Sequence, residues 1–190
     1  DTVPIPSAGG RLALSCPHRP PRVLRRRRPP GRGGAHVTAF DMAAVEAAGG
    51  ARQFVAKTDE HLASLVVEDE PVLTHDQMWD NYAYFMNAVL PIAEEVGVKL
   101  ALHPDDPPVP MLGGVPRIFG SVEGFEKGME IANSSAWGLD LCLGCCSEMP
   151  GGKLNVMRMI ERFGPLGKIL YIHFRDVQGT VPTFQECFIG

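Results

Sequence analysis

The chain has 190 residues, of which 45% are hydrophobic and 21% are charged, the balance of a globular domain. Its apolar runs are shorter than the roughly 20 residues that a transmembrane helix needs, so we expect no membrane-spanning helix and no membrane partner. The first 30 residues contain no hydrophobic stretch long enough for a signal peptide. Five cysteines are an odd number, which argues against a disulfide framework and favours a cytoplasmic location, where thiols stay reduced.

The net charge of −4 combines two segments of opposite character. Residues 1–32 contain eight arginines and one acidic residue, and they also hold seven of the 17 prolines. Residues 33–190 contain ten lysines and arginines against 21 acidic residues. Because a segment rich in Pro and Arg cannot build a core, we expect residues 1–32 to be a disordered tail. The missing initiator Met favours a non-native or out-of-frame origin for this tail, with residues 33–190 as the folded domain.

The basic tail also has the composition of a segment that binds nucleic acid or an anionic membrane. It lacks interleaved aromatic residues and an accompanying folded reader domain. We therefore expect no nucleic-acid partner; salt-sensitive DNA binding that disappears on deletion of residues 1–32 would show otherwise.

Predicted secondary structure begins just after the tail. Ala35–Phe40 is expected to form a short strand, Asp41–Ala48 a small helix, and Asp59–Val67 a weak helix. The spacing of Thr74 and Gln77 is that of a capping box, which predicts the start of a longer helix.

That longer helix is predicted by apolar residues that recur at intervals of three and four. Pro91 is expected to kink the helix, and Gly97 is expected to end it. The residues that form its apolar face are Trp79, Tyr82, Met86, Val89, Ala93 and Val96.

Three short apolar strands follow, separated by amphipathic helices. The strands are expected at Val98–Leu102, Gly138–Leu143 and Lys168–Phe174. One helix is expected to start after Ser121, and another spans Lys153–Phe163. This alternation predicts an α/β fold with parallel strands and right-handed crossovers.

Each of the three strands ends at or near a residue that can bind a metal ion. His103 follows the first strand, Cys142 lies near the end of the second, and His173 lies near the end of the third. Because parallel strands converge at their carboxyl ends, these side chains are expected to meet. Imidazole and thiolate suit a divalent transition metal such as Zn, Fe or Mn.

Simpler interpretations exist for each residue alone. A single histidine at a strand end is most often a hydrogen-bonded structural residue, and a single buried cysteine is most often a small hydrophobic residue. The sequence CLGCC also contains C-x-x-C, which is typical of half a zinc site or of a redox motif. A second C-x-x-C is missing, so we interpret Cys145 and Cys146 as loop residues.

Further polar residues follow the same strands and would suit a polyhydroxylated, anionic substrate, with arginines for its carboxylate. Each is equally compatible with a solvated loop. Arg175 and Asp176 are the strongest candidates because they directly follow a predicted ligand. The whole group comprises Asp105, Asp106, Arg117, Glu148, Arg175, Asp176 and Gln178.

Three long strings in the chain closely resemble the mannonate dehydratase family, and the resemblance extends over about residues 33–190. They are GVKLALHPDDPPVPMLGGVPRIF, GLDLCLGCCSEM and GKILYIHFRDVQGTVPTFQECFIG. HPDDPP, L-C-x-G and IHFRDVQG are chemically unusual, so the similarity is specific.

The resemblance implies a partial (β/α)₈ TIM barrel of the xylose-isomerase-like type and a Mn²⁺ or Fe²⁺ cofactor. It also implies dehydration of D-mannonate to 2-keto-3-deoxy-D-gluconate in hexuronate catabolism. By motif, the family's metal ligands fall on His103, Cys142 and His173. Asp105, Asp106, Arg175, Asp176 and Gln178 would bind substrate or support the ligands. No catalytic base is assigned, and a homo-oligomeric parent protein is left open.

The family's fourth ligand, an aspartate nearer the C-terminus, has no counterpart in the chain, and a whole barrel typically needs about 250 residues. Two alternatives follow. One is another metal-dependent sugar isomerase or epimerase on the same barrel, and the other is an inactive fragment.

Overall fold

The computed structural model describes residues 37–47, 50 and 72–188. The predictions of a tail at residues 1–32 and of a weak helix at Asp59–Val67 lie outside these residues. Within them, no helix is both long enough and apolar enough to cross a membrane.

A three-stranded parallel sheet forms the centre of the structure, as predicted. Its strands are β2 (Leu100–Leu102), β5 (Trp137–Cys142) and β6 (Ile169–His173), in the order β2–β5–β6. The pairing places Cys142 opposite His173 at the carboxyl edge of the sheet. The fold is therefore mixed α/β with a parallel sheet.

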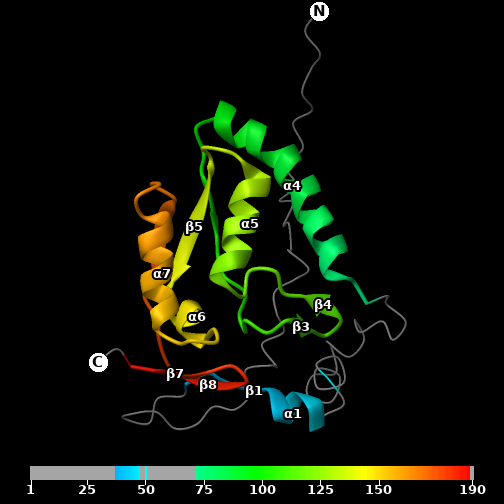
Figure 1. The fold of residues 1–190 in the computed structure, drawn as a ribbon, viewed down its shortest axis with the longest axis vertical. Helices are drawn as coiled ribbons and strands as arrows, with labels where there is room; N and C mark the ends of the chain where they lie inside the picture. Colours follow the sequence, from blue (N-terminus) through cyan, green and yellow to red (C-terminus); the bar gives the residue numbers. More distant parts are fainter. Residues whose placement is uncertain (1–36, 48–49, 51–71, 189–190) are drawn as a thin grey trace, which may run out of the picture.

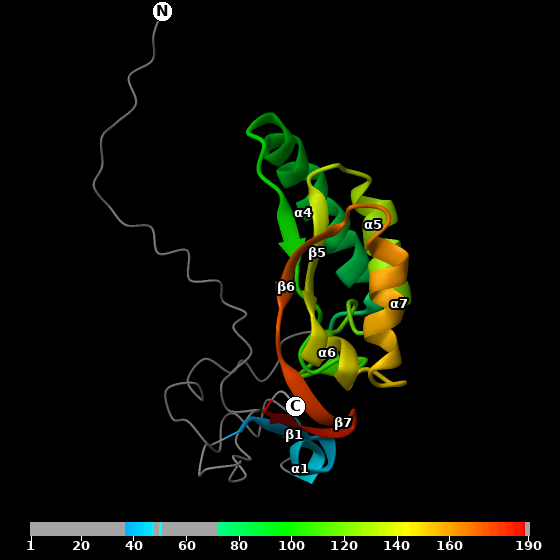
Figure 2. The same cartoon turned by 90° about the vertical axis from the view of Figure 1, so that its left-hand side faces the viewer.

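Helices connect the strands and cover one face of this sheet (Figures 1 and 2). Helix α5 (Val122–Ala132) joins β2 to β5, while α6 (Leu143–Glu148) and α7 (Leu154–Phe163) join β5 to β6. The predicted helix after Ser121 is confirmed, because the Ser121 side chain accepts a hydrogen bond from the backbone of Gly124.

Helix α4 (His75–Glu95) packs against α5 and begins at the predicted capping box. The Thr74 side chain accepts from the Gln77 backbone, and the Gln77 side chain accepts from the Thr74 backbone. The helix runs through Pro91, and Gly97 follows its end with φ of +68°, a backbone conformation that glycine adopts at little cost.

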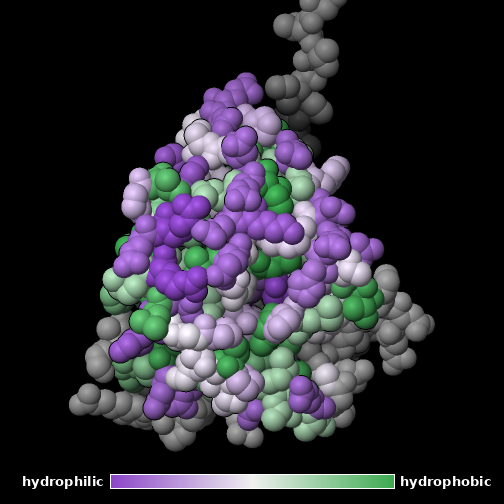
Figure 3. Space-filling model, in the orientation of Figure 1, coloured by the Kyte–Doolittle hydropathy of each residue, from purple (hydrophilic) through white to green (hydrophobic). Residues whose placement is uncertain are grey.

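The main core lies between the sheet and these helices. Trp137 and Leu139 of β5 are fully buried against Phe125 of α5 and Phe163 of α7. Burying each such side chain contributes roughly 1.5–3 kcal/mol to folding. Figure 3 shows many hydrophilic side chains on the face of the molecule seen in Figure 1, as expected for amphipathic helices.

A second, antiparallel sheet lies beyond the carboxyl edge of the first (Figure 1). It consists of β1 (Ala39–Asp41), β8 (Thr183–Cys187) and β7 (Asp176–Thr180), in the order β1–β8–β7. The predicted strand at Ala35–Phe40 is confirmed at its C-terminal end by β1. Strands β7 and β8 were not predicted from the sequence.

Three further short elements complete the described structure. Helix α1 (Met42–Ala47) confirms the small helix predicted after the first strand. Within the proline-rich loop, β3 (Met111–Leu112) pairs with β4 (Val115–Pro116) in a small hairpin. A small core joins this hairpin to the antiparallel sheet, and its buried residues are Phe40, Val45, Val109, Leu112 and Phe184.

Candidate metal centre

The structure places His103, Cys142 and His173 at the carboxyl edge of the parallel sheet, but His173 is not in the group of mutually close donor atoms that contains His103 and Cys142. Nδ1 of His173 lies 3.5 Å from Nε2 of His103, and the centroids of the two rings are 5.7 Å apart. Cys142 stands beside His173 in the strand register. Their role as ligands stays a prediction.

The alternation of side chains along β5 explains why Cys142 faces this site. Leu139 and Leu141 point into the core beneath the helices. Asp140 and Cys142 therefore lie on the opposite face of the strand. One buried oxygen of Asp140 has no hydrogen-bond partner among the described residues.

The His103 ring is oriented by the backbone carbonyl of the next residue, Pro104. Its Nδ1 lies 2.7 Å from the carbonyl oxygen of Pro104, and because a carbonyl only accepts, Nδ1 carries the proton. In the neutral ring this leaves the lone pair on Nε2, which faces His173. A backbone partner of this kind commonly fixes a metal-binding histidine.

Charged neighbours favour the protonated form of His103. Burial of the ring opposes that form, but the hydrogen bond to Cys142 and the negative charges of Cys142 and Asp140 outweigh it. The pKa of His103 is therefore raised above its ordinary value.

Cys142 is stabilised as a thiolate, the form that binds metal ions. The Cys145 thiol donates a hydrogen bond to it, which lowers its pKa well below the ordinary value. Burial opposes this effect, while the His103 ring and the backbone N–H of Cys145 reinforce it. The same contact raises the pKa of Cys145, because that thiol keeps its proton beside a negative sulfur.

The prediction that Cys145 and Cys146 lie in a loop was wrong. Both are buried in α6, a helix of only six residues, which is too short to produce a recognisable periodicity. Cys142 is the N-cap of this helix and accepts a hydrogen bond from the Cys145 backbone at 3.4 Å.

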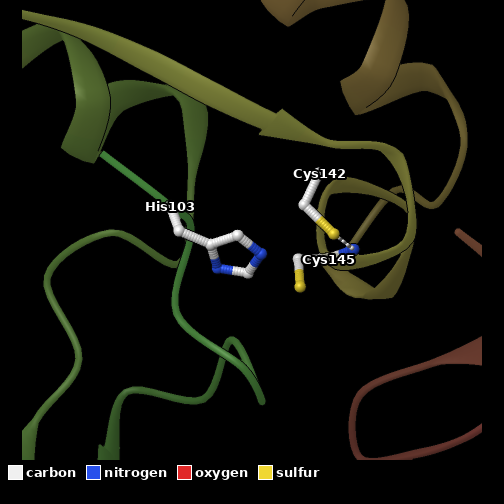
Figure 4. Close-up of side chains that lie close together, drawn as sticks. All are labelled: His103, Cys142 and Cys145. Atoms are coloured by element: carbon white, nitrogen blue, oxygen red, sulfur yellow. Dashed lines mark hydrogen bonds between the residues drawn. The ribbon is translucent and has the colours of Figure 1, made fainter. Parts of the chain in front are cut away.

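Cys145 thereby joins the candidate metal centre. One donor atom each from His103, Cys142 and Cys145 lies within 4.8 Å of the other two (Figure 4). Imidazole and thiolate donors at this separation fit a divalent transition metal. A second group of donors, Asp106, Cys145 and Glu148, is equally close.

Arg175 occupies the middle of this second group. Its Nη2 lies 2.7 Å from Glu148, its Nε 2.8 Å from Glu186, and its Nη1 3.3 Å from Asp106. Nη1 also lies 3.3 Å from Sγ of Cys145. Burial lowers the pKa of Arg175, but Glu148 and Asp106 outweigh burial and raise it overall.

Asp105 belongs to neither group of donors. Its side chain instead holds the loop after β2 in place. Its carboxylate accepts a hydrogen bond from the Phe119 backbone at 2.7 Å and pairs with Arg117 at 3.3 Å.

Asp176 and Gln178 lie on β7, and the hydrogen bonds found for them are local. The Asp176 side chain accepts from the backbone of Val177 at 2.8 Å. Gln178 accepts from Gln185 across the β7–β8 pair at 3.3 Å.

A family model described as D-mannonate dehydratase (UxuA) matches residues 34–188. The chain belongs to the mannonate dehydratase family.

Individual mannonate dehydratases agree with this assignment. "Mannonate dehydratase 2" of Halalkalibacterium halodurans is 36% identical over 115 residues, covering 60% of the chain and 32% of the relative. The mannonate dehydratase of Streptococcus suis is 34% identical over 127 residues, covering 67% of the chain and 34% of the relative. The chain thus spans about a third of the length of these relatives.

A solved structure of the family is also similar. The crystal structure of mannonate dehydratase from Streptococcus suis serotype 2 aligns with a TM-score of 0.65 and 30% sequence identity. The alignment covers 83% of the chain and 42% of that structure.

Sequence reasoning missed two residues that border this candidate site. Asp140 could have been found, because it precedes Cys142 by two residues in a strand and so shares its face. Glu186 gave no local signal, since it reaches Arg175 only through the β7–β8 hairpin.

Proposed function

We propose that the chain is part of a metal-dependent dehydratase that converts D-mannonate to 2-keto-3-deoxy-D-gluconate and water, in hexuronate breakdown. The observation that carries the proposal is the convergence of His103, Cys142 and His173 at one sheet edge. Family membership favours this reaction over the isomerase and epimerase alternatives.

The parallel sheet is interpreted as a section of a (β/α)₈ barrel of the xylose-isomerase-like type. Strands β2, β5 and β6 with helices α5 and α7 would form consecutive β/α units. The similarity to the Streptococcus suis structure supports this interpretation. In such barrels the carboxyl ends of the strands carry the active site, and the candidate donors lie at those ends.

His103, Cys142 and His173 would hold a Mn²⁺ or Fe²⁺ ion. Such an ion acts as a Lewis acid, which would stabilise the negative charge that develops when the proton beside the substrate carboxylate is removed. The backbone carbonyl of Pro104 keeps Nε2 of His103 directed at the site, so the imidazole loses little freedom on binding.

The remaining predicted residues are proposed to shape the pocket. Asp105 would fix the loop that follows His103, through its bonds to Arg117 and Phe119. Asp106 and Arg175 would position α6, and with it Cys142, because Arg175 links the two carboxylates Asp106 and Glu148. Asp176 and Gln178 are proposed to contact substrate hydroxyls.

Incubation of the chain with D-mannonate and either Mn²⁺ or Fe²⁺, followed by assay for a 2-keto-3-deoxy product, tests the proposal. We expect product that requires the added metal. A product with the mass of the substrate would instead indicate an isomerase or epimerase. The complete parent protein is assayed in parallel, since the chain spans about a third of its relatives.

Two cysteine variants distinguish loss of the metal site from a general effect of replacing a thiol. Cys142→Ser is expected to reduce both metal binding and product formation sharply. The matched control is Cys146→Ser in α6, which changes the same chemical group in a buried cysteine outside the group of His103, Cys142 and Cys145. Equal activity of the two variants would contradict the assignment of Cys142.

A further inference from the structure

We propose that two copies of the chain associate through strand β6 and the outer face of helix α7. A two-fold axis would join the two parallel sheets into one sheet of six strands, with α7 of one copy packed antiparallel against α7 of the other. This inference goes beyond the proposed function and does not involve the metal centre. In a closed barrel a further strand would pair with β6, so the inference concerns the 190-residue chain by itself.

Strand β6 leaves one edge of the parallel sheet open. In the order β2–β5–β6 it is bonded to β5 on one side and to no other strand among the described residues. Its outer backbone N–H and C=O groups are therefore a template for another strand. Because a two-fold axis reverses the chain direction, a copy of β6 would pair with it antiparallel, and both copies would contribute the same residues.

Helix α7 has a second apolar face beside this edge. Met159 and Phe163 are fully buried in the main core. By contrast, Leu154, Met157 and Ile160 are 64%, 52% and 39% exposed. These three residues follow one another at intervals of three and so form one outer stripe along the helix.

The strand edge and the outer stripe lie on the same side of the sheet. Ile172 of β6 pairs in register with Leu141 of β5, which points into the core beneath the helices, so Ile172 points to that side as well. Leu154 and Met157 line a pocket together with Phe174, which directly follows β6. A second copy of the chain would therefore cover the strand edge and the stripe together.

One axis can serve both contacts. Helix α7 connects β5 to β6, a crossover that places it over these two strands. Since strands lie about 4.8 Å apart, such a helix and its copy across the axis would lie about 10 Å apart, the distance of packed helices. Met157 and Ile172 also lie at similar heights, each roughly 9–10 Å from the turn that joins α7 to β6.

The charges on α7 match an antiparallel copy of the same helix. With the axis at Met157, Leu154 of one copy faces Ile160 of the other, and Lys153 faces Glu161. Both charged side chains are exposed, and neither forms an ion pair within the part of the chain that the structure describes. The symmetry forms the pair twice, whereas a parallel copy would set Lys153 against Lys153 and Glu161 against Glu161.

The apolar surface available at this edge is close to what a stable dimer needs. Such interfaces bury roughly 800 Å² on each partner. Six large side chains each offer on the order of 100 Å², and the strand backbone and the stems of the charged residues add to this. The six side chains are Leu154, Met157, Ile160, Tyr171, Ile172 and Phe174.

Sedimentation velocity of the full chain over a range of concentrations measures the association. We expect a species with twice the chain mass of 20.6 kDa, which dissociates on dilution. Hydrogen exchange at the β6 amides that do not bond to β5 is expected to slow as the dimer forms. A species of 20.6 kDa alone at every concentration would overturn the inference.

Charge reversal tests the antiparallel arrangement. Lys153→Glu and Glu161→Lys each set like charges against one another, and each is expected to raise the Kd of the dimer about tenfold. The double variant restores opposite charges and is expected to return the Kd to that of the unaltered chain. Both positions are exposed, so the fold tolerates the changes. Unchanged Kd in the single variants, or a double variant no tighter than they are, would overturn the inference.

The apolar contact is tested at the axis. Met157→Lys places two like charges against each other and is expected to abolish the dimer. The matched control is Ile92→Lys on α4, where the replaced side chain is 61% exposed and lies outside the interface. Equal Kd values for these two variants would overturn the inference. None of the measurements uses metal or D-mannonate, so their failure would leave the proposed function in place, and absence of turnover would leave the dimer in place.

Discussion

Nη2 of Arg175 lies 2.7 Å from Oε1 of Glu148, a side chain with no exposed surface. The same guanidinium contacts Asp106 and Glu186, so one cation joins the loop after β2, helix α6 and strand β8. A buried charge is stable only while it is paired, because desolvation otherwise costs several kcal/mol. The cluster therefore makes the position of α6 depend on Arg175.

We expect Arg175→Met to lower the free energy of unfolding by about 3–5 kcal/mol, because the buried Glu148 carboxylate then loses the guanidinium that balances its charge. Urea denaturation measures the change. The double variant Arg175→Met, Glu148→Leu removes both charges and is expected to recover much of the loss. A single variant that costs less than about 1 kcal/mol, the value of an exposed pair, would contradict the structure.

Gly144 allows Arg175 to cross α6. A Cβ atom at Gly144 would lie 2.8 Å from Cγ and 2.9 Å from Cδ of Arg175, closer than packed carbon atoms come. Arg175 cannot move aside freely, since its guanidinium is held by carboxylates. This contact gives a physical reason for the glycine in the L-C-x-G string.

We expect Gly144→Ala to destabilise the chain by about 1–3 kcal/mol, the usual cost of overpacking. Without the contact the same substitution would stabilise α6 by up to about 1 kcal/mol, because alanine is the better helix former. The sign of the change in the free energy of unfolding, measured by urea denaturation, therefore shows whether the contact exists. In an Arg175→Gly background Cβ, Cγ and Cδ of residue 175 are all absent, so the contact is gone and Gly144→Ala is expected to become neutral or stabilising.

The parallel sheet could be predicted from sequence because its signals are local. Each strand is a continuous apolar run, and each helix between them carries an apolar face at helical spacing. The convergence of His103 with His173 then followed from the rule that parallel strands share a carboxyl edge.

The antiparallel sheet could not be predicted in the same way. Ala39 of β1 pairs with Gln185 of β8, and no pattern within either segment indicates a partner so far along the chain. β7 also follows β6 after only two residues, so the sequence predicts one strand with a trailing loop where the structure has two strands. The surroundings of Arg175 were missed for this reason, because Glu186 is supplied by β8.

The capping box at the start of α4 is a separate source of stability. Gln77 N lies 3.2 Å from Oγ1 of Thr74, and Thr74 N lies 2.9 Å from Oε1 of Gln77. Thr74→Ala removes an N-cap acceptor and is expected to cost about 1 kcal/mol in thermal or urea unfolding. Thr74→Ser keeps the hydroxyl and serves as the control; equal losses in the two variants would show that the cap contributes nothing.

Glu94 makes the stability of the α4 end depend on pH. Its Oε1 accepts from Ser134 Oγ at 2.6 Å and from the Ser135 backbone at 3.1 Å. The hydrogen bond from Ser134 is the main cause of a lowered pKa for this carboxyl, and the Ser135 backbone adds to it.

The direction of the pH effect follows from this lowered pKa. The unfolded chain takes up a proton at Glu94 at a higher pH than the folded chain does, so the contribution is full at neutral pH. This stabilisation is lost as the pH falls below the pKa of an ordinary carboxyl group and through the lowered pKa of Glu94 in the folded chain. Glu94→Gln is therefore expected to lose less stability between neutral and acidic pH than the unaltered chain, measured by urea midpoints across pH. Glu95→Gln, at the next helix position, is the control, and parallel acid profiles for all three proteins would refute the assignment.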